Sequence, residues 1–139
     1  MEKGTSRARI EPVAEDRFVL LRRQLGVTSF GINEIVLEPG QRGRIHLHRE
    51  QEEVFLVLEG ELTIAIEGTE ETLAKGELIR VGPEVRRQLV NRGPERLILL
   101  ALGGAGEHQS RDAEAFESWD QAEGASPRDV PLPEDLPLD

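Results

Sequence analysis

The sequence predicts an all-β domain built as a small barrel or sandwich. Short apolar runs rich in β-branched residues alternate with turns that contain glycine or proline, spaced about eight to twelve residues apart. No run with helical periodicity over three turns precedes Gly103. A chain of 139 residues is long enough for one domain with a sizeable core.

The first third of the chain is expected to supply an arm and three strands. Residues 1–16 are polar and predict a loose arm or an edge strand. The elements expected after it are a strand at 18–22, a strand at 27–37, a turn at Pro39-Gly40 and a strand that carries His46 and His48.

The middle of the chain is expected to complete the barrel, which the sequence places at residues 17–103. Residues 54–66 read as two strands joined around Gly60. The first half of this run is apolar on both faces, which is typical of a strand between two packed layers. The elements expected after it are a hairpin turn at 67–71 and strands that begin at Thr72, Leu78, Arg87 and Arg96.

Residues 104–139 are expected to form a tail outside the barrel. Phe116 and Trp119 are spaced i, i+3, which predicts a short helix within 113–122 that lies on the barrel. The segment 126–139 holds four prolines and is expected to be extended. Its apolar residues favour a tail that is packed across a surface over a disordered one.

Composition excludes several classes of function. With 17 Lys and Arg against 27 Asp and Glu, the net charge of −10 argues against nucleic acid or an anionic membrane as partner. No apolar run is long enough to span a membrane, and the charged N-terminus lacks a signal core, so we expect a cytoplasmic protein. Cysteine is absent, which excludes disulfides and thiol chemistry.

His46, His48 and Glu53 form the most informative cluster. Side chains at i and i+2 of a strand point to the same side, so the two imidazoles are expected to enter one space. Glu53 begins the next apolar run and can bring a carboxylate beside them. Two nitrogens and one oxygen make a plausible face for a divalent metal ion.

These residues resemble the first motif of the cupin superfamily. The motif Gly-x5-His-x-His-x4-Glu-x6-Gly is filled by Gly40, His46, His48, Glu53 and Gly60. The second cupin motif is degenerate here: Gly76 and Asn91 match, but Gly82, Glu84 and Arg87 stand where the family has Pro, Gly and His. The resemblance covers about residues 18–103. It implies a cupin-type jelly-roll β-barrel, to which the short C-terminal helix or extended tail predicted above is added, and a homodimer.

The resemblance also implies that His46, His48 and Glu53 are metal ligands, for Fe, Mn, Ni or Zn. A shorter motif spacing that cupins also use would select Glu52 in place of Glu53. The fourth ligand of the family is a histidine, and its position holds Arg87, whose guanidinium remains protonated and has no lone pair for a metal.

Three outcomes remain open at the Arg87 position. The metal can survive on three ligands while Arg87 meets an anionic substrate. Alternatively, no metal binds and a Glu53–Arg87 ion pair takes its place in a metal-free sensor or interaction module. In the third outcome the site is vestigial and the barrel serves assembly or regulation.

The expected ligand of the barrel is a small molecule. Phe55 shares a strand face with Glu53, and Leu89 shares one with Arg87, so we expect Phe55, Leu89 and Arg87 to contact it. Whether the protein is an enzyme stays open. If it is, the resemblance implies oxygenase or isomerase chemistry that depends on the metal.

Overall fold

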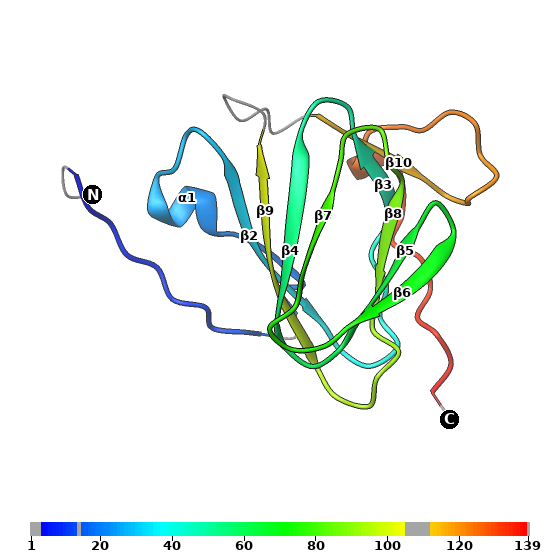
Figure 1. Ribbon diagram of the computed structural model, residues 1–139, viewed down its shortest axis with the longest axis horizontal. Helices are drawn as coiled ribbons and strands as arrows, with labels where there is room; N and C mark the ends of the chain where they lie inside the picture. Colours follow the sequence, from blue (N-terminus) through cyan, green and yellow to red (C-terminus); the bar gives the residue numbers. More distant parts are fainter. Residues whose placement is uncertain (1–3, 14, 105–111, 139) are drawn as a thin grey trace.

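A computed structural model of the chain describes residues 4–13, 15–104 and 112–138. Over these residues, two antiparallel five-stranded sheets face each other and close a small barrel (Figure 1). The predicted all-β barrel is therefore confirmed. The expected arm, 1–16, and tail, 104–139, are described only in part, because residues 1–3, 14, 105–111 and 139 lie outside the described ranges.

The first sheet has the strand order β1-β2-β9-β4-β7. Its strands are β1 (Phe18–Leu20), β2 (Gly31–Leu37), β9 (Leu97–Gly104), β4 (Glu52–Glu59) and β7 (Leu78–Val81). The second sheet has the order β10-β3-β8-β5-β6. Its strands are β10 (Ala113–Phe116), β3 (Ile45–His48), β8 (Arg87–Val90), β5 (Leu62–Ile66) and β6 (Thr69–Leu73).

The helices of the described residues are few and short. They are α1 (Leu21–Leu25) and the 3-10 turn η1 (Pro127–Asp129). Neither is long enough or apolar enough to cross a membrane.

The apolar core lies between the sheets, and its largest aliphatic residues lie toward one end of the barrel. Alternation along each strand sends one set of side chains between the sheets, where they pack against each other. Leu37, Val57, Leu62, Leu97 and Leu99 are almost completely buried there. Because Leu37 pairs with Leu97 while Glu53 pairs with Gly103, these leucines and Glu53 lie toward opposite ends of the strands. The end that holds Glu53 is therefore the one available for a ligand.

Two tight turns join strands where the sequence places them. Gly60 connects β4 to β5 at a φ of +81°, and a Cβ there would overlap the carbonyl oxygen of Arg96. Glu67 and Gly68 connect β5 to β6, and both have positive φ values, of 50° and 85°. Such turns match the twist of the flanking strands. The two strands around Gly60 and the hairpin were both predicted.

The chain after Leu20 differs from the strand expected at 18–22. Only Phe18–Leu20 is extended, and residues 21–25 form α1. The helix ends at Gly26, whose φ of 74° is left-handed, and the Gly26 N–H donates to the Arg22 carbonyl. Leu21 is buried, so the helix places one apolar side chain against the barrel. A five-residue helix is too short to show helical periodicity in the sequence.

The helix predicted within 113–122 is wrong. Residues 113–116 form strand β10, which pairs with β3 so that Ala113 lies opposite His48 and Phe116 opposite Ile45. Phe116 and Trp119 pack with Ile45, as the predicted helix would also have allowed. Without β10, however, one edge of β3 would be unpaired, and a strand there satisfies its hydrogen-bonding groups. Tertiary pairing thus outweighs the i, i+3 spacing.

The end of the chain is extended and lies along the outside of the second sheet (Figure 1). We call residues 130–138 the C-terminal strap. The Leu136 N–H donates to the Gly40 carbonyl at 2.7 Å. Arg42 donates through two nitrogens to the Glu134 carbonyl, at 3.1 and 2.8 Å. Val130 is buried, and its carbonyl accepts from Arg44 Nε at 2.6 Å. The strap is therefore attached to the segment that leads into β3.

Candidate metal centre

Strands from the two sheets bring His46, His48 and Glu53 together between the layers. The histidines alternate along β3, and Glu53 is the second residue of β4. His46 Nε2 lies 3.7 Å from Glu53 Oε1, and His48 Nε2 lies 3.5 Å from Glu53 Oε2. One ligand atom from each residue falls within 4.8 Å of the other two. The cluster expected from the sequence is therefore present as a group.

The other ring nitrogen of each histidine is directed at an acceptor. His46 Nδ1 lies 3.1 Å from the Arg44 carbonyl, so Nδ1 carries the proton and Nε2 has a free lone pair in the neutral ring. His48 Nδ1 faces Asp112 Oδ2 at 3.8 Å, beyond hydrogen-bond distance, and has no hydrogen-bond partner among the described residues. When each neutral ring carries its proton on Nδ1, two lone pairs point at a carboxylate that also only accepts. A proton or a metal cation between them is needed to relieve this repulsion.

The distances suit a metal ion. Two ligand atoms each about 2.0–2.2 Å from a zinc-sized ion in a tetrahedral arrangement are about 3.4 Å apart. The Nε2 to Oε separations of 3.7 and 3.5 Å are close to this value and longer than a hydrogen bond. The residues present therefore fit a divalent ion without large movement.

Glu53 is held as a carboxylate. Burial raises its pKa, but hydrogen bonds and charge interactions with His46 and His48, which act when the Nε2 atoms carry protons, outweigh this effect and hold the pKa well below its usual range. Glu53 Oε1 has no hydrogen-bond partner among the described residues, although it is buried. A buried anionic oxygen of this kind is suited to bind a cation.

The two adjacent glutamates have different surroundings. Glu52 is exposed and its Oε1 accepts from Arg80 Nε at 2.6 Å on the outside of the first sheet. Glu53 points the other way, because neighbouring residues of a strand face opposite sides. The structure thus places Glu53, and not Glu52, beside the histidines.

Asp112 is a site residue that the sequence did not indicate. Its carboxylate accepts from the backbone N–H groups of Glu50 and Gln51, at 3.0 to 3.1 Å, and so fixes the turn between β3 and β4. The same carboxylate faces His48 Nδ1. A carboxylate behind a histidine orients the ring and raises its basicity as a ligand. No spacing in the sequence relates Asp112 to the motif, because β10 reaches β3 through tertiary packing.

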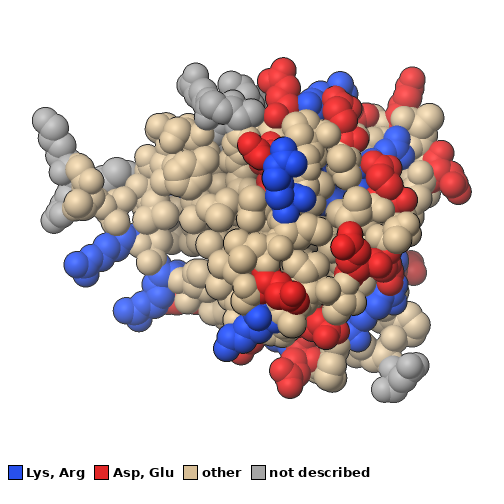
Figure 2. Space-filling view, in the orientation of Figure 1, with Lys and Arg blue, Asp and Glu red and all other residues tan. Residues whose placement is uncertain are grey.

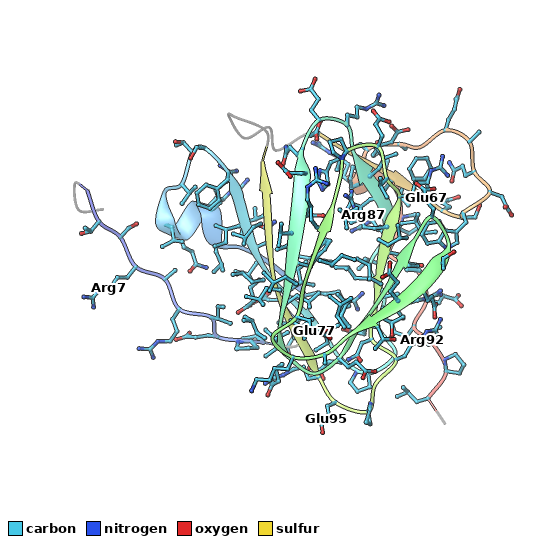
Figure 3. The ribbon with its side chains drawn as sticks, in the orientation of Figure 1. Arg7, Glu67, Glu77, Arg87, Arg92 and Glu95 are labelled. Atoms are coloured by element: carbon cyan, nitrogen blue, oxygen red, sulfur yellow. The ribbon has the colours of Figure 1, made fainter. Side chains whose placement is uncertain are left out.

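Arg87 lies directly beside the cluster and is completely buried. It pairs with His46 across β3 and β8, and its Nε is 4.0 Å from Glu53 Oε1. Figure 3 shows it between the sheets, at the end of the barrel where β4 and β8 begin. Its Nη2 donates weakly to the carbonyls of Val81 and Gly82, at 3.4 and 3.3 Å. Nε and Nη1 have no hydrogen-bond partner among the described residues.

Burial lowers the pKa of Arg87, while Glu53 and Glu67 oppose this effect. The guanidinium remains charged and therefore cannot act as a metal ligand. With neutral histidines, the charges of Glu53 and Arg87 cancel within the site.

A small cavity opens next to the cluster. Its volume is about 220 Å³, which is below the usual range for ligand pockets of about 300–1,000 Å³. Phe55 and Leu89 line it, as predicted for ligand contacts, whereas Arg87 is not among the lining residues. The polar groups on its wall are those of Asn33, Arg44, His46, His48 and Glu53. The cavity is thus mainly apolar, with a polar patch that includes the candidate metal ligands.

Comparison with known protein families identifies the family of this fold. The family model described as the Cupin domain matches residues 33–103, more than half of the chain. Among the curated proteins, no sequence is significantly similar.

Solved structures show the same fold. A sugar phosphate isomerase from a cupin superfamily of Silicibacter pomeroyi is 25% identical, with a TM-score of 0.62 over 87% of this chain and 83% of that one. A cupin protein from Bacteroides fragilis is 23% identical, with a TM-score of 0.62 over 87% and 98%. The Cupin_2 domain of an XRE family transcriptional regulator from Enterobacter cloacae is 21% identical, with a TM-score of 0.58 over 63% and 94%.

Proposed function

This chain belongs to the cupin family, and on that premise we propose that it binds a small molecule in the barrel cavity beside a divalent metal ion. His46, His48 and Glu53 would hold the ion. The observation that carries the proposal is the convergence of two imidazole lone pairs and a carboxylate at 3.5 and 3.7 Å, next to a cavity that can receive a ligand. Three acceptors in this arrangement are stable only around a cation or added protons.

The donor set indicates which ions would bind. Two imidazoles and one carboxylate suit Fe, Mn, Ni or Zn, and they leave coordination positions open toward the cavity. An ion with open positions polarises an oxygen of the bound molecule as a Lewis acid. If the protein is an enzyme, we favour isomerase chemistry, because the similar structure from Silicibacter pomeroyi is named a sugar phosphate isomerase. Oxygenase chemistry uses the same type of ligand face.

A metal-free sensor is the competing function. The observation that favours it is the buried Arg87, whose Nε lies 4.0 Å from Glu53 Oε1 and whose positive charge opposes a cation. The neighbour from Enterobacter cloacae shows that a cupin domain occurs within a transcriptional regulator. In this alternative the ion pair replaces the metal, and the cavity still receives a small molecule.

Metal binding separates the two functions, and adjacent glutamates provide a matched control. Isothermal titration of the chelator-treated protein with Mn²⁺, Ni²⁺ or Zn²⁺ is expected to show one site per chain. Glu53→Gln or His46→Ala is expected to weaken binding by at least a hundredfold, because each removes one of three ligands. Glu52→Gln removes a carboxylate one residue away on the outer face, so it should leave the affinity unchanged. A wild-type protein that binds none of these ions would exclude the metal-dependent function.

A second copy of the chain is the proposed partner of the first sheet. Leu78 is 61% exposed on the outer face of this sheet, at the β7 edge. Phe18 and Leu20 of β1, at 43% and 41%, lie at the opposite edge on the side of the cavity. Figure 2 shows an area over β2 and β9 that is nearly free of charged side chains, while acidic and basic residues gather over the second sheet. Because each chain has a net charge of −10, two copies can approach closely only through such a face.

Light scattering tests this dimer. The wild-type protein is expected to have twice the mass of one chain, and Leu78→Glu is expected to shift it to the monomer. Leu138→Glu is the control, because Leu138 is also exposed, at 72%, but lies on the C-terminal strap. A monomeric wild type, or equal effects of both substitutions, would contradict the proposed interface.

A further inference from the structure

Arg44 carries unused hydrogen-bond donors on the wall of the cavity. It precedes β3, lines the cavity together with His46, His48 and Glu53, and is partly buried. Its Nε donates to the Val130 carbonyl at 2.6 Å, which fixes the position of the guanidinium. The two Nη nitrogens, with four N–H donors, have no hydrogen-bond partner among the described residues.

The charge of Arg44 is not neutralised by a carboxylate. Among the described residues, no Asp or Glu oxygen lies within 4.0 Å of its nitrogens. A second guanidinium, that of Arg17, is nearby and is also without such a carboxylate. Burial lowers the pKa of Arg44, and repulsion by Arg17 lowers it further. In a chain with 27 acidic residues, two neighbouring cations without a carboxylate partner are an unusual arrangement.

Arg17 is held in place from the same segment. Its Nη1 donates to the Arg42 carbonyl at 3.3 Å, so it lies beside the chain that enters β3. Phe18, the next residue, lines the cavity. Arg44 therefore provides a positive charge on the cavity wall, and Arg17, which does not line the cavity, adds positive charge behind it. Both are supported by backbone carbonyls rather than by acidic side chains.

We propose that Arg44, with Arg17 behind it, binds an anionic group, a phosphate or carboxylate, of the small molecule that enters the cavity. The Nη donors of one guanidinium match two oxygens of such a group. The binding of an anion here does not require a metal. Only the orientation of the rest of the bound ligand, toward His46, His48 and Glu53, rests on the proposed function.

The cavity limits the size of the molecule. Arg44 and His46 are two residues apart on one side of the chain, so their Cα atoms are about 7 Å apart in extended backbone. The cavity volume of 220 Å³ corresponds to about seven molecules of liquid water. A small anionic metabolite would fit with its charged group at Arg44 and an uncharged end at the metal ligands.

Arg87 is less suited to this role. It is 0% exposed, it is not among the cavity-lining residues, and its nearest charged partner is Glu53. The positive charge of Arg87 faces Glu53 inside the protein, whereas the positive charge of Arg44 faces the cavity and can contact a ligand. The anionic contact first expected of Arg87 is therefore reassigned to Arg44.

The test is titration of the chelator-treated chain of 139 residues with inorganic phosphate. Binding is measured by calorimetry or by phosphorus NMR. The wild type is expected to bind one phosphate saturably. Arg44→Gln is expected to weaken binding about 10- to 100-fold, since a charge-assisted hydrogen-bonded contact is lost. The matched control is Arg42→Gln. Arg42 also holds the C-terminal strap through a carbonyl but does not line the cavity, so this variant should change the affinity less than about threefold.

Other outcomes would overturn the proposal. These are the absence of saturable phosphate binding to the wild type, an Arg44→Gln variant that binds as well as the wild type, or equal losses in both variants. Equal losses would indicate an effect of the strap or binding in the outer hollow that Arg42 and Arg44 both line. Titration in chelator separates this proposal from the proposed function, because phosphate binding to the metal-free wild type depends on Arg44 and not on a metal ion. A wild type that binds phosphate through Arg44 but no metal would disprove the metal site alone.

Discussion

Substitution of Glu53 by leucine is expected to lower the free energy of unfolding by about 3–5 kcal/mol, the typical result of removing one partner of a buried ion pair. Arg87 is completely buried and lies 4.0 Å from Glu53, so the substitution leaves an uncompensated positive charge between the sheets. The measurement is urea denaturation of the wild type and the variant. Both are kept in chelator, because a bound metal would add its own stabilisation.

A double variant tests the cause of this loss. Glu53→Leu combined with Arg87→Met removes both charges and keeps apolar side chains of similar size. Most of the lost stability should return, since replacing a buried ion pair by apolar residues is often neutral or stabilising. Glu52→Leu is the control for leucine in β4, because the Glu52–Arg80 pair is exposed and should change stability by less than about 1 kcal/mol. If the double variant is no more stable than Glu53→Leu, then the loss does not come from the charge of Arg87.

Substitution of Arg87 by histidine is expected to raise the affinity for a divalent metal at least tenfold. The change acts in two ways: it removes a buried cation next to the site, and it adds an imidazole on β8 opposite His46. A metal ion held by three protein ligands, with one position open, is bound less tightly than one that has a further imidazole ligand. Isothermal titration with Zn²⁺ or Ni²⁺ measures the effect.

Arg87→Met separates the two contributions. It removes the cation without supplying a ligand, so its affinity should lie between those of the wild type and Arg87→His. Equal affinities of the two variants would mean that position 87 does not reach the metal, and that only the charge matters. An affinity of Arg87→His at or below that of the wild type would contradict a metal site at His46, His48 and Glu53.

The strand face on which each member of the cluster lies could be predicted, because it depends on a local rule. The two-residue period of a strand sends His46 and His48 to one side, and the same rule separates Glu52 from Glu53. The turn at Gly60 could also be read from the chain, because an apolar run on each side predicts two strands. The barrel itself followed from many short strands and from the motif spacing.

The surroundings of the cluster could not be predicted, since they depend on contacts between distant segments. Asp112 reaches His48 only because β10 pairs with β3. The expected helix at 113–122 and the observed strand both bury Phe116, so periodicity could not choose between them. Likewise, whether Arg87 or Arg44 faces the cavity depends on which backbone carbonyls and carboxylates lie near each guanidinium in the folded chain. Spacing carries no information about this.

The cavity is built in part from segments outside the family-matched barrel, which ends at residue 103. Phe18 precedes the matched region, while Ala113 and Pro127 follow it, and all three line the cavity. Val130 and Asp112, which contact Arg44 and His48, also lie beyond it. The shape of the cavity can therefore change through the two ends of the chain, while the barrel and the candidate metal ligands stay the same. In a chimera, the grafted tail would change the cavity wall, and the host barrel would keep the cluster of His46, His48 and Glu53.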